Sequence, residues 1–318
     1  MRSHKKLAAL CAMPLLWAVL ALAAKPQEPA VQGPTIKSQV NLVNLFVTVR
    51  DKSKHIVTNL TQDDFKVSED GQDQKIAFFS KEVTLPITLG LLMDTSGSEQ
   101  NMLGAIQDGA SSFLNRVMRK GDEAMIISFD LDVDLLADLT DDRSQLNRAI
   151  HRAQVNAGGP MMTPGTLPTG NIGTDFYDAL YLACHDELAS EAGRKAVVVL
   201  TDAEDNGSKV KVEEAIEAAQ RTDTVVHILL VYDPHNGANS GVAKKITDET
   251  GGRMIVVNNE KHLQEAFDQI SEELRSQYTL GYYPTNNARD GNFRKIKVEV
   301  SNHDDKVLAR KGYYAPKG

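Results

Sequence analysis

The segment DTSGS, residues 94–98, places one carboxylate and two hydroxyl side chains at alternate positions: Asp94, Ser96 and Ser98. It directly follows the apolar run ITLGLLM, which is typical of a buried strand. Two further oxygen-bearing side chains stand at other junctions of strand and helix patterns. Thr174 comes just before a helical pattern, and Asp202 comes just after an apolar strand. Together these residue types indicate a site built from carboxylate and hydroxyl oxygens.

We expect these five residues to lie close together in the folded protein. In an open parallel sheet, the loops at the carboxyl ends of neighbouring strands converge where the strand order reverses. Two carboxylates and three hydroxyls are hard oxygen donors, which suit Mg²⁺ or Mn²⁺ and do not suit a metal that prefers thiolates. The sequence therefore predicts a metal site formed by Asp94, Ser96, Ser98, Thr174 and Asp202.

A purely structural interpretation of the same segment exists. Ser96 and Glu99 have the Ser-x-x-Glu spacing of a capping box, which would by itself explain small polar residues ahead of a helix at 101–118. The two distant oxygen donors, Thr174 and Asp202, favour the metal site over this alternative.

The elements that position these residues follow an α/β pattern. After Pro86, strand-like runs alternate with amphipathic helical patterns, and near-continuous apolar runs such as KAVVVL and VVHILLV are typical of a parallel sheet covered on both faces. Short β-branched and aromatic runs flank this region on both sides. We therefore predict an α/β fold with a doubly wound, mainly parallel sheet. A flanking β-sandwich-like module would be built from N- and C-terminal segments, although their apolar faces could instead pack on helices of the α/β domain.

The predicted organisation has five parts. They are a signal peptide at 1–24, a flexible lead-in at 25–36, an N-terminal β module at 37–85, the α/β domain at 86–275, and C-terminal strands at 276–318 that pair with the N-terminal module.

The N-terminus and the composition bear on location and partners. A basic start, an apolar stretch and the small residues Ala21-Leu22-Ala23 are typical of a secretory signal peptide, and an uncleaved membrane anchor is the alternative. Cleavage after residue 24 would take the formal net charge from −8 to −11 and leave Cys184 as the single cysteine. We expect a secreted or periplasmic protein with no membrane span after cleavage. Such an acidic chain lacks the basic surface that nucleic-acid binding requires.

The motif resembles the von Willebrand factor type A family, whose metal-ion-dependent adhesion site is a D-x-S-x-S segment completed by a distant Thr and a distant Asp. DTSGS, IGTDFYDAL and VLTDAEDN match it in order, with Ala203 where the family usually has Gly. The resemblance runs from about residue 86 to 275, and the flanks resemble a secreted bacterial subfamily. It implies that Ser96 and Ser98 bind the ion directly, Thr174 directly or through water, and Asp94 and Asp202 largely through water.

The resemblance further implies a non-enzymatic function in cell adhesion or protein binding. An under-neutralised Mg²⁺ or Mn²⁺ would accept a carboxylate from an Asp or Glu of a protein partner. The alternative is a phosphatase-like hydrolase, because Asp130 and Asp132 in DLDV match the D-x-D-x-[TV] pattern of enzymes with an aspartate nucleophile. A hairpin turn between two strands explains the same residues without chemistry.

Overall fold

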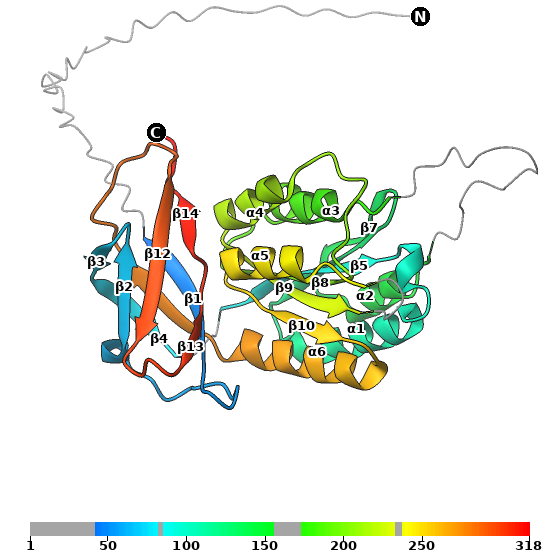
Figure 1. Ribbon diagram of the computed structural model, residues 1–318, viewed down its shortest axis with the longest axis horizontal. Coiled ribbons are helices and arrows are strands. Elements are labelled where there is room, and N and C mark those ends of the chain that lie inside the picture. Colours follow the sequence, from blue (N-terminus) through cyan, green and yellow to red (C-terminus); the bar gives the residue numbers. More distant parts are fainter. Residues whose placement is uncertain (1–41, 82–84, 156–172, 233–236) are drawn as a thin grey trace, which may run out of the picture. The chain divides into compact units, whose positions relative to one another are not determined.

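The computed structural model describes residues 42–81, 85–155, 173–232 and 237–318 (Figure 1). The predicted signal peptide and lead-in, residues 1–36, lie outside these ranges. Among the helices within them, none combines the length and the apolar character needed to cross a membrane.

A six-stranded sheet forms the centre of the α/β region. Its strands are β5 (Ile87–Asp94), β6 (Glu123–Phe129), β7 (Val133–Thr140), β8 (Arg194–Thr201), β9 (Thr224–Val231) and β10 (Met254–Val257). Their spatial order is β10-β9-β8-β5-β6-β7, and all neighbours are parallel except β6 and β7. Every residue of β5, β8 and β9 is buried, as expected for strands covered on both faces. The chain order reverses between β5 and β8, where a doubly wound sheet places its binding site.

Helices cover both faces of this sheet (Figure 1). One apolar core contains residues of α1 (Leu103–Val117), α2 (Arg143–Ile150) and α6 (Glu260–Arg275), and the other contains residues of α3 (Phe176–Leu182), α4 (Val212–Arg221) and α5 (Ser240–Thr250). A one-turn π-helix, Ala183–Glu187, continues α3, which is shorter than the helical pattern in the sequence. The predicted doubly wound α/β fold is confirmed.

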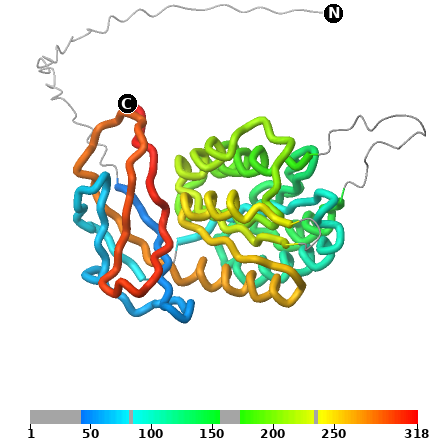
Figure 2. The backbone as a smooth tube through the Cα atoms, in the orientation of Figure 1, coloured from blue at the N-terminus to red at the C-terminus, as the bar shows by residue number. Residues whose placement is uncertain are grey.

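The flanking strands form two four-stranded sheets. Their members are β1 (Val43–Arg50), β2 (Phe65–Glu69), β3 (Gln72–Gln74), β4 (Ile76–Ser80), β11 (Tyr278–Tyr282), β12 (Phe293–Val300), β13 (Lys306–Leu308) and β14 (Gly312–Tyr314). One sheet has the order β13-β1-β11-β4 and the other β14-β12-β2-β3, so each contains strands from both ends of the described chain. Strand β1 accordingly pairs antiparallel with β11, with Leu45 opposite Leu280. Figure 2 shows blue N-terminal and orange-to-red C-terminal segments together in this module.

A single apolar core lies between these two sheets. Leu45 of β1, Leu280 and Tyr282 of β11, and Ile296 of β12 all belong to it. Along β12, Ile296 and Val300 are buried, whereas Phe293 is exposed. The sandwich built from N- and C-terminal segments is therefore confirmed as the arrangement of these strands.

The α/β region begins and ends on adjacent strands of this module. It follows β4 and precedes β11, and these two strands pair antiparallel, with Ser80 opposite Thr279. The arrangement is that of an insertion whose two ends lie close together.

Two side chains that are often reactive in proteins, Cys184 and His227, are buried in the α/β region. Cys184 is fully buried, and burial raises the pKa of its thiol to about 12, so it behaves as a small apolar residue. His227 in β9 is also buried, but neither ring nitrogen has a hydrogen-bond partner. Oε2 of Glu273 lies 3.9 Å from Nδ1 of the ring.

Candidate metal centre

The first part of the site is the chain that leaves β5. Asp94 is the last residue of this buried strand, and its side chain is completely inaccessible. The backbone N–H of Ser96 donates to Asp94 Oδ1 at 2.9 Å, which turns the chain sharply after the strand. The hydroxyls of Ser96 and Ser98 then lie 3.0 Å apart. Three of the five predicted donors are thus grouped within one turn.

Thr201, the last residue of β8, connects this turn to the neighbouring strand. Its hydroxyl donates to Asp94 Oδ2 at 2.6 Å and accepts the backbone N–H of Ala203 at 2.9 Å. Ala203 has a φ of 60°, in the left-handed region where Gly is favoured, which agrees with the usual Gly at this position of the family motif. The sequence analysis assigned no role to Thr201.

Asp202 lies next to Thr201 and is only 7% exposed. Its Oδ1 accepts the backbone N–H of Glu204 at 3.0 Å, and its carbonyl accepts the N–H of Asn239, which caps α5. These bonds fix the Asp202 backbone and leave carboxylate lone pairs available for other groups.

Thr174 reaches the same edge from the segment before α3. It is 8% exposed, and its backbone N–H donates to Asn206 Oδ1 at 2.8 Å. The N–H of Asn206 donates back to the Thr174 carbonyl at 3.3 Å. Thr174 is therefore attached to the loop that follows Asp202, beyond the carboxyl end of β8.

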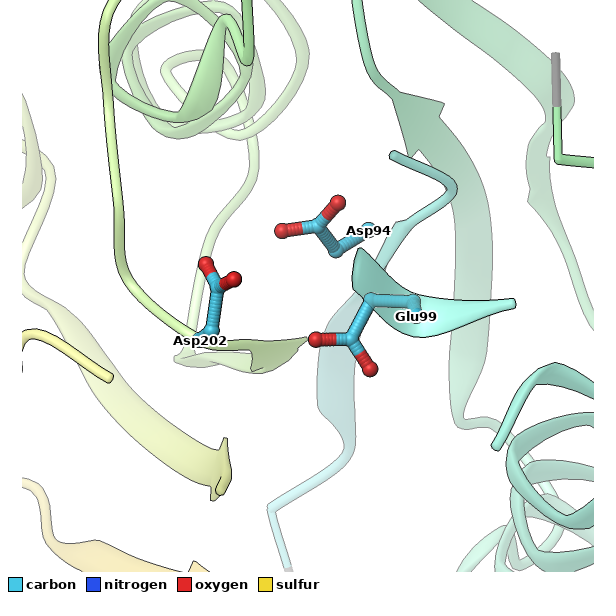
Figure 3. A group of neighbouring side chains, drawn as sticks. All are labelled: Asp94, Glu99 and Asp202. Atoms are coloured by element: carbon cyan, nitrogen blue, oxygen red, sulfur yellow. The ribbon is translucent and has the colours of Figure 1, made fainter. Parts of the chain in front are cut away.

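A third carboxylate that the sequence analysis did not assign also enters the site. Oxygen atoms of Asp94, Glu99 and Asp202 all lie within 4.8 Å of one another, and all three residues are buried. Figure 3 shows the three side chains around a common space. Ser96 is the N-cap of a one-turn helix, Gly97–Glu99, but its side chain makes no capping hydrogen bond. The capping-box interpretation is wrong, because Glu99 is the end of that turn and faces inward.

The electrostatics of this arrangement favour a cation. Burial raises the pKa of Asp94 from 3.8 to about 7, hydrogen bonds from Ser96 and Thr201 lower it, and the charge of Asp202 adds to the rise. Two like charges within 4.8 Å of each other repel by about 3 kcal/mol or more at an effective dielectric constant of about 20. A divalent cation among these oxygens would convert that repulsion into attraction.

Asp130 and Asp132, the residues of the phosphatase alternative, lie in the turn between β6 and β7. Asp130 Oδ1 accepts the N–H of Leu131 at 2.5 Å, and Oδ2 accepts the hydroxyl of Thr95 at 3.2 Å. The N–H of Asp130 also donates to the carbonyl of Asp132. The hairpin interpretation of these residues is confirmed, and the Asp130 carboxylate holds the turn together.

One known protein family matches the part of the chain that contains the five predicted donors. Residues 89–204, which run from within β5 to the start of the loop after β8, match the family model of the von Willebrand factor type A domain. The chain contains a von Willebrand factor type A domain. A search of curated proteins returns no match to this chain.

Solved structures resemble this chain at low identity. Proximal thread matrix protein 1 from the mussel byssus is 13% identical, with a TM-score of 0.50 over 74% of this chain and 50% of that one. A von Willebrand factor type A protein from Catenulispora acidiphila is 10% identical, with a TM-score of 0.48 over 88% of this chain and 75% of that one. A second structure of the mussel protein, 14% identical with a TM-score of 0.46 over 61% of this chain and 49% of that one, has a zinc-occupied adhesion-site motif.

Proposed function

We propose that this chain is an exported, non-enzymatic protein-binding module whose von Willebrand factor type A domain binds a partner through a divalent cation. Asp94, Ser96, Ser98, Thr174 and Asp202 would hold Mg²⁺ or Mn²⁺. The bound ion would supply a positive charge to which an Asp or Glu carboxylate of a protein partner binds. Adhesion is the class of function that this arrangement serves.

The observation that carries the proposal is the donor set at the carboxyl edge of β5 and β8. Carboxylates and hydroxyls converge there, and the described residues contribute no thiol or imidazole to the acidic group at this edge. Oxygen-only donors suit Mg²⁺ and Mn²⁺. The Ser96 and Ser98 hydroxyls, 3.0 Å apart, add neutral donors that contact a cation without cancelling its charge. The residues present therefore fit the ion.

The phosphatase alternative has less support. An aspartate nucleophile needs a carboxylate oxygen that is available for attack. Both carboxylate oxygens of Asp130 instead accept hydrogen bonds from its own turn and from Thr95.

We also propose the organisation that goes with this function. Residues 37–85 and 276–318 would form the supporting β module, residues 86–275 the binding domain, and residues 1–24 a signal peptide that directs the protein to the periplasm or the exterior. Edman sequencing of the mature protein from each cell fraction tests the processing site. A mature N-terminus other than residue 25 would contradict the boundary.

Calorimetric titration with Mg²⁺ and Mn²⁺ tests the site itself. We expect one weak site per chain, abolished by Asp94→Ala and weakened by Ser98→Ala. Ser112→Ala provides the matched control, because Ser112 is an exposed serine on α1. Cation binding that is unchanged in Asp94→Ala and Asp202→Ala would refute the site.

Partner binding is tested by capture from the extracellular fraction with Mg²⁺ and again with a chelator. Thr174→Ala is expected to weaken capture and to leave the unfolding midpoint nearly unchanged, because Thr174 lies outside the helices and strands. Capture that survives the chelator would exclude a cation-dependent mechanism.

A further inference from the structure

We propose that Glu99 is a built-in carboxylate ligand of this cation site, and that it competes with the carboxylate of an outside partner. The inference rests on the proposed function, because it concerns the same ion. It adds a residue that the D-x-S-x-S pattern does not contain.

The position of Glu99 is set by the same turn that presents the two serines. Its backbone N–H donates to the Ser96 carbonyl at 3.0 Å, which closes the one-turn helix Gly97–Glu99. Gly97, two residues before Glu99, and Gln100, directly after it, are exposed. Glu99 itself is only 1% exposed. The turn therefore directs this one long side chain inward, toward Asp94 and Asp202 (Figure 3).

Its neighbours make Glu99 part of a mixed donor set. The same segment presents the Ser96 and Ser98 hydroxyls, and Thr201 orients Asp94 from the neighbouring strand. A carboxylate oxygen of Glu99 lies within 4.8 Å of one from each aspartate, a separation that a single cation can bridge. Glu99 is thus placed to contact an ion that the other donors already hold.

The charge balance explains why Glu99 would oppose a partner. Two carboxylates neutralise a divalent cation, so a third makes the centre formally negative. An incoming carboxylate is then repelled and must displace Glu99 from the ion. Removing the Glu99 charge should weaken cation binding and strengthen the binding of outside carboxylates, two effects of opposite sign that a purely structural residue would not produce.

Glu99→Gln in the full chain tests this, since it keeps the side-chain shape and removes the charge. We expect Mn²⁺ affinity, measured by calorimetry, to fall about tenfold, the loss expected for one ligand contact. Water proton relaxation of the Mn²⁺-loaded protein should rise, because water replaces the lost ligand. Acetate, added as the carboxylate probe, should displace water from the ion and lower the relaxation. In Glu99→Gln this decrease should need a roughly tenfold lower acetate concentration than in the unmodified protein.

Glu204→Gln is the matched control. Glu204 is an exposed acid two residues from Asp202 and lies outside the group of three carboxylates. It should leave Mn²⁺ affinity, relaxation and the acetate effect close to those of the unmodified protein. If Glu204→Gln had the same effect as Glu99→Gln, the effect would come from long-range charge and not from a ligand contact, and the proposal would be overturned.

The two proposals fail in different ways. An unmodified protein that binds no Mn²⁺ would refute the proposed function, and the role of Glu99 with it. An unmodified protein that binds Mn²⁺ with the same affinity, relaxation and acetate response as Glu99→Gln would refute only the role of Glu99. If Glu99→Gln does not fold, Glu99→Asp keeps the charge and withdraws the carboxylate by one methylene. Relaxation unchanged in that variant would equally overturn the proposal.

Discussion

Thr201 donates a 2.6 Å hydrogen bond from its hydroxyl to Oδ2 of Asp94, and so joins the ends of two adjacent parallel strands through one buried side chain. The same hydroxyl accepts the N–H of Ala203. Asp94 is thereby held between its own turn, through Ser96, and the neighbouring strand. The orientation of this carboxylate depends on a residue outside the five predicted donors.

Thr201→Val tests this dependence, because valine keeps the shape and removes both hydrogen bonds. Groups that orient metal ligands typically contribute about 10- to 100-fold to metal affinity, so a loss of that size is expected in a Mg²⁺ titration. Leaving Asp94 and Ala203 without a buried partner should also cost about 1–3 kcal/mol of stability. Thr247→Val, which removes a buried hydroxyl bonded within α5, should lower stability without changing the Mg²⁺ affinity.

Ala203→Gly should be unusually well tolerated for a buried alanine. A left-handed conformation costs a non-glycine residue about 1–2 kcal/mol, and glycine would recover this at a φ of 60°. That gain offsets the entropic cost of glycine and the loss of one buried methyl. Ala215→Gly, in the interior of α4, has no such compensation and should lose more stability. Urea denaturation of both variants decides the point, and an equal loss in each would count against strain at Ala203.

His227 should make the protein sensitive to mild acid. Burial lowers the pKa of its imidazole from 6.5 to about 4, opposed by the charge of Glu273 and reinforced by that of Arg253. Glu273 is itself paired with Arg50 and Arg253. Between pH 6.5 and 4 the unfolded chain binds a proton that the folded chain excludes, so stability falls as pH falls, by at most about 3 kcal/mol.

His227→Leu should remove this contribution. The free energy of unfolding, measured from pH 7.5 to 4, should fall less steeply in the variant than in the unmodified protein. His303→Leu, at an exposed position, should keep the original slope. Parallel slopes for the unmodified protein and His227→Leu would show that the acid sensitivity has another source.

Leu280→Ala probes whether the terminal segments share one core. Leu280 is completely buried in β11 between the two sheets of the sandwich, and its truncation should cost about 2–5 kcal/mol. Hydrogen exchange should accelerate both in residues 43–49 of β1 and in residues 296–300 of β12. Leu85→Ala, at a half-exposed leucine, should leave both regions protected. Faster exchange in β11 alone would mean that the segments unfold independently.

Much of this architecture could be predicted from the sequence, because its causes are local. The buried strands β8 and β9 are continuous apolar runs, and their alternation with amphipathic helices leaves few other folds. The grouping of Asp94, Ser96 and Ser98 likewise follows from one turn after one strand.

The features that were missed depend on contacts between distant segments. Thr201 looks like any β-branched residue at the end of a strand, and its role becomes visible only when β8 lies beside β5. Glu99 has the spacing of a capping residue, and a backbone turn rather than its own chemistry directs it inward. His227 lies in the apolar run of β9, and nothing in that run shows that both ring nitrogens lack a hydrogen-bond partner.

The pairing of Ser80 with Thr279 has a mechanical consequence. Because the von Willebrand factor type A region follows β4 and precedes β11, a pull on the carboxyl edge of its sheet reaches the sandwich through two chain connections, one to each of these paired strands. Each strand carries part of the load, and the two are drawn in the same direction rather than peeled from each other. A single protease cut in either connection would leave the domain tethered to the sandwich by the other.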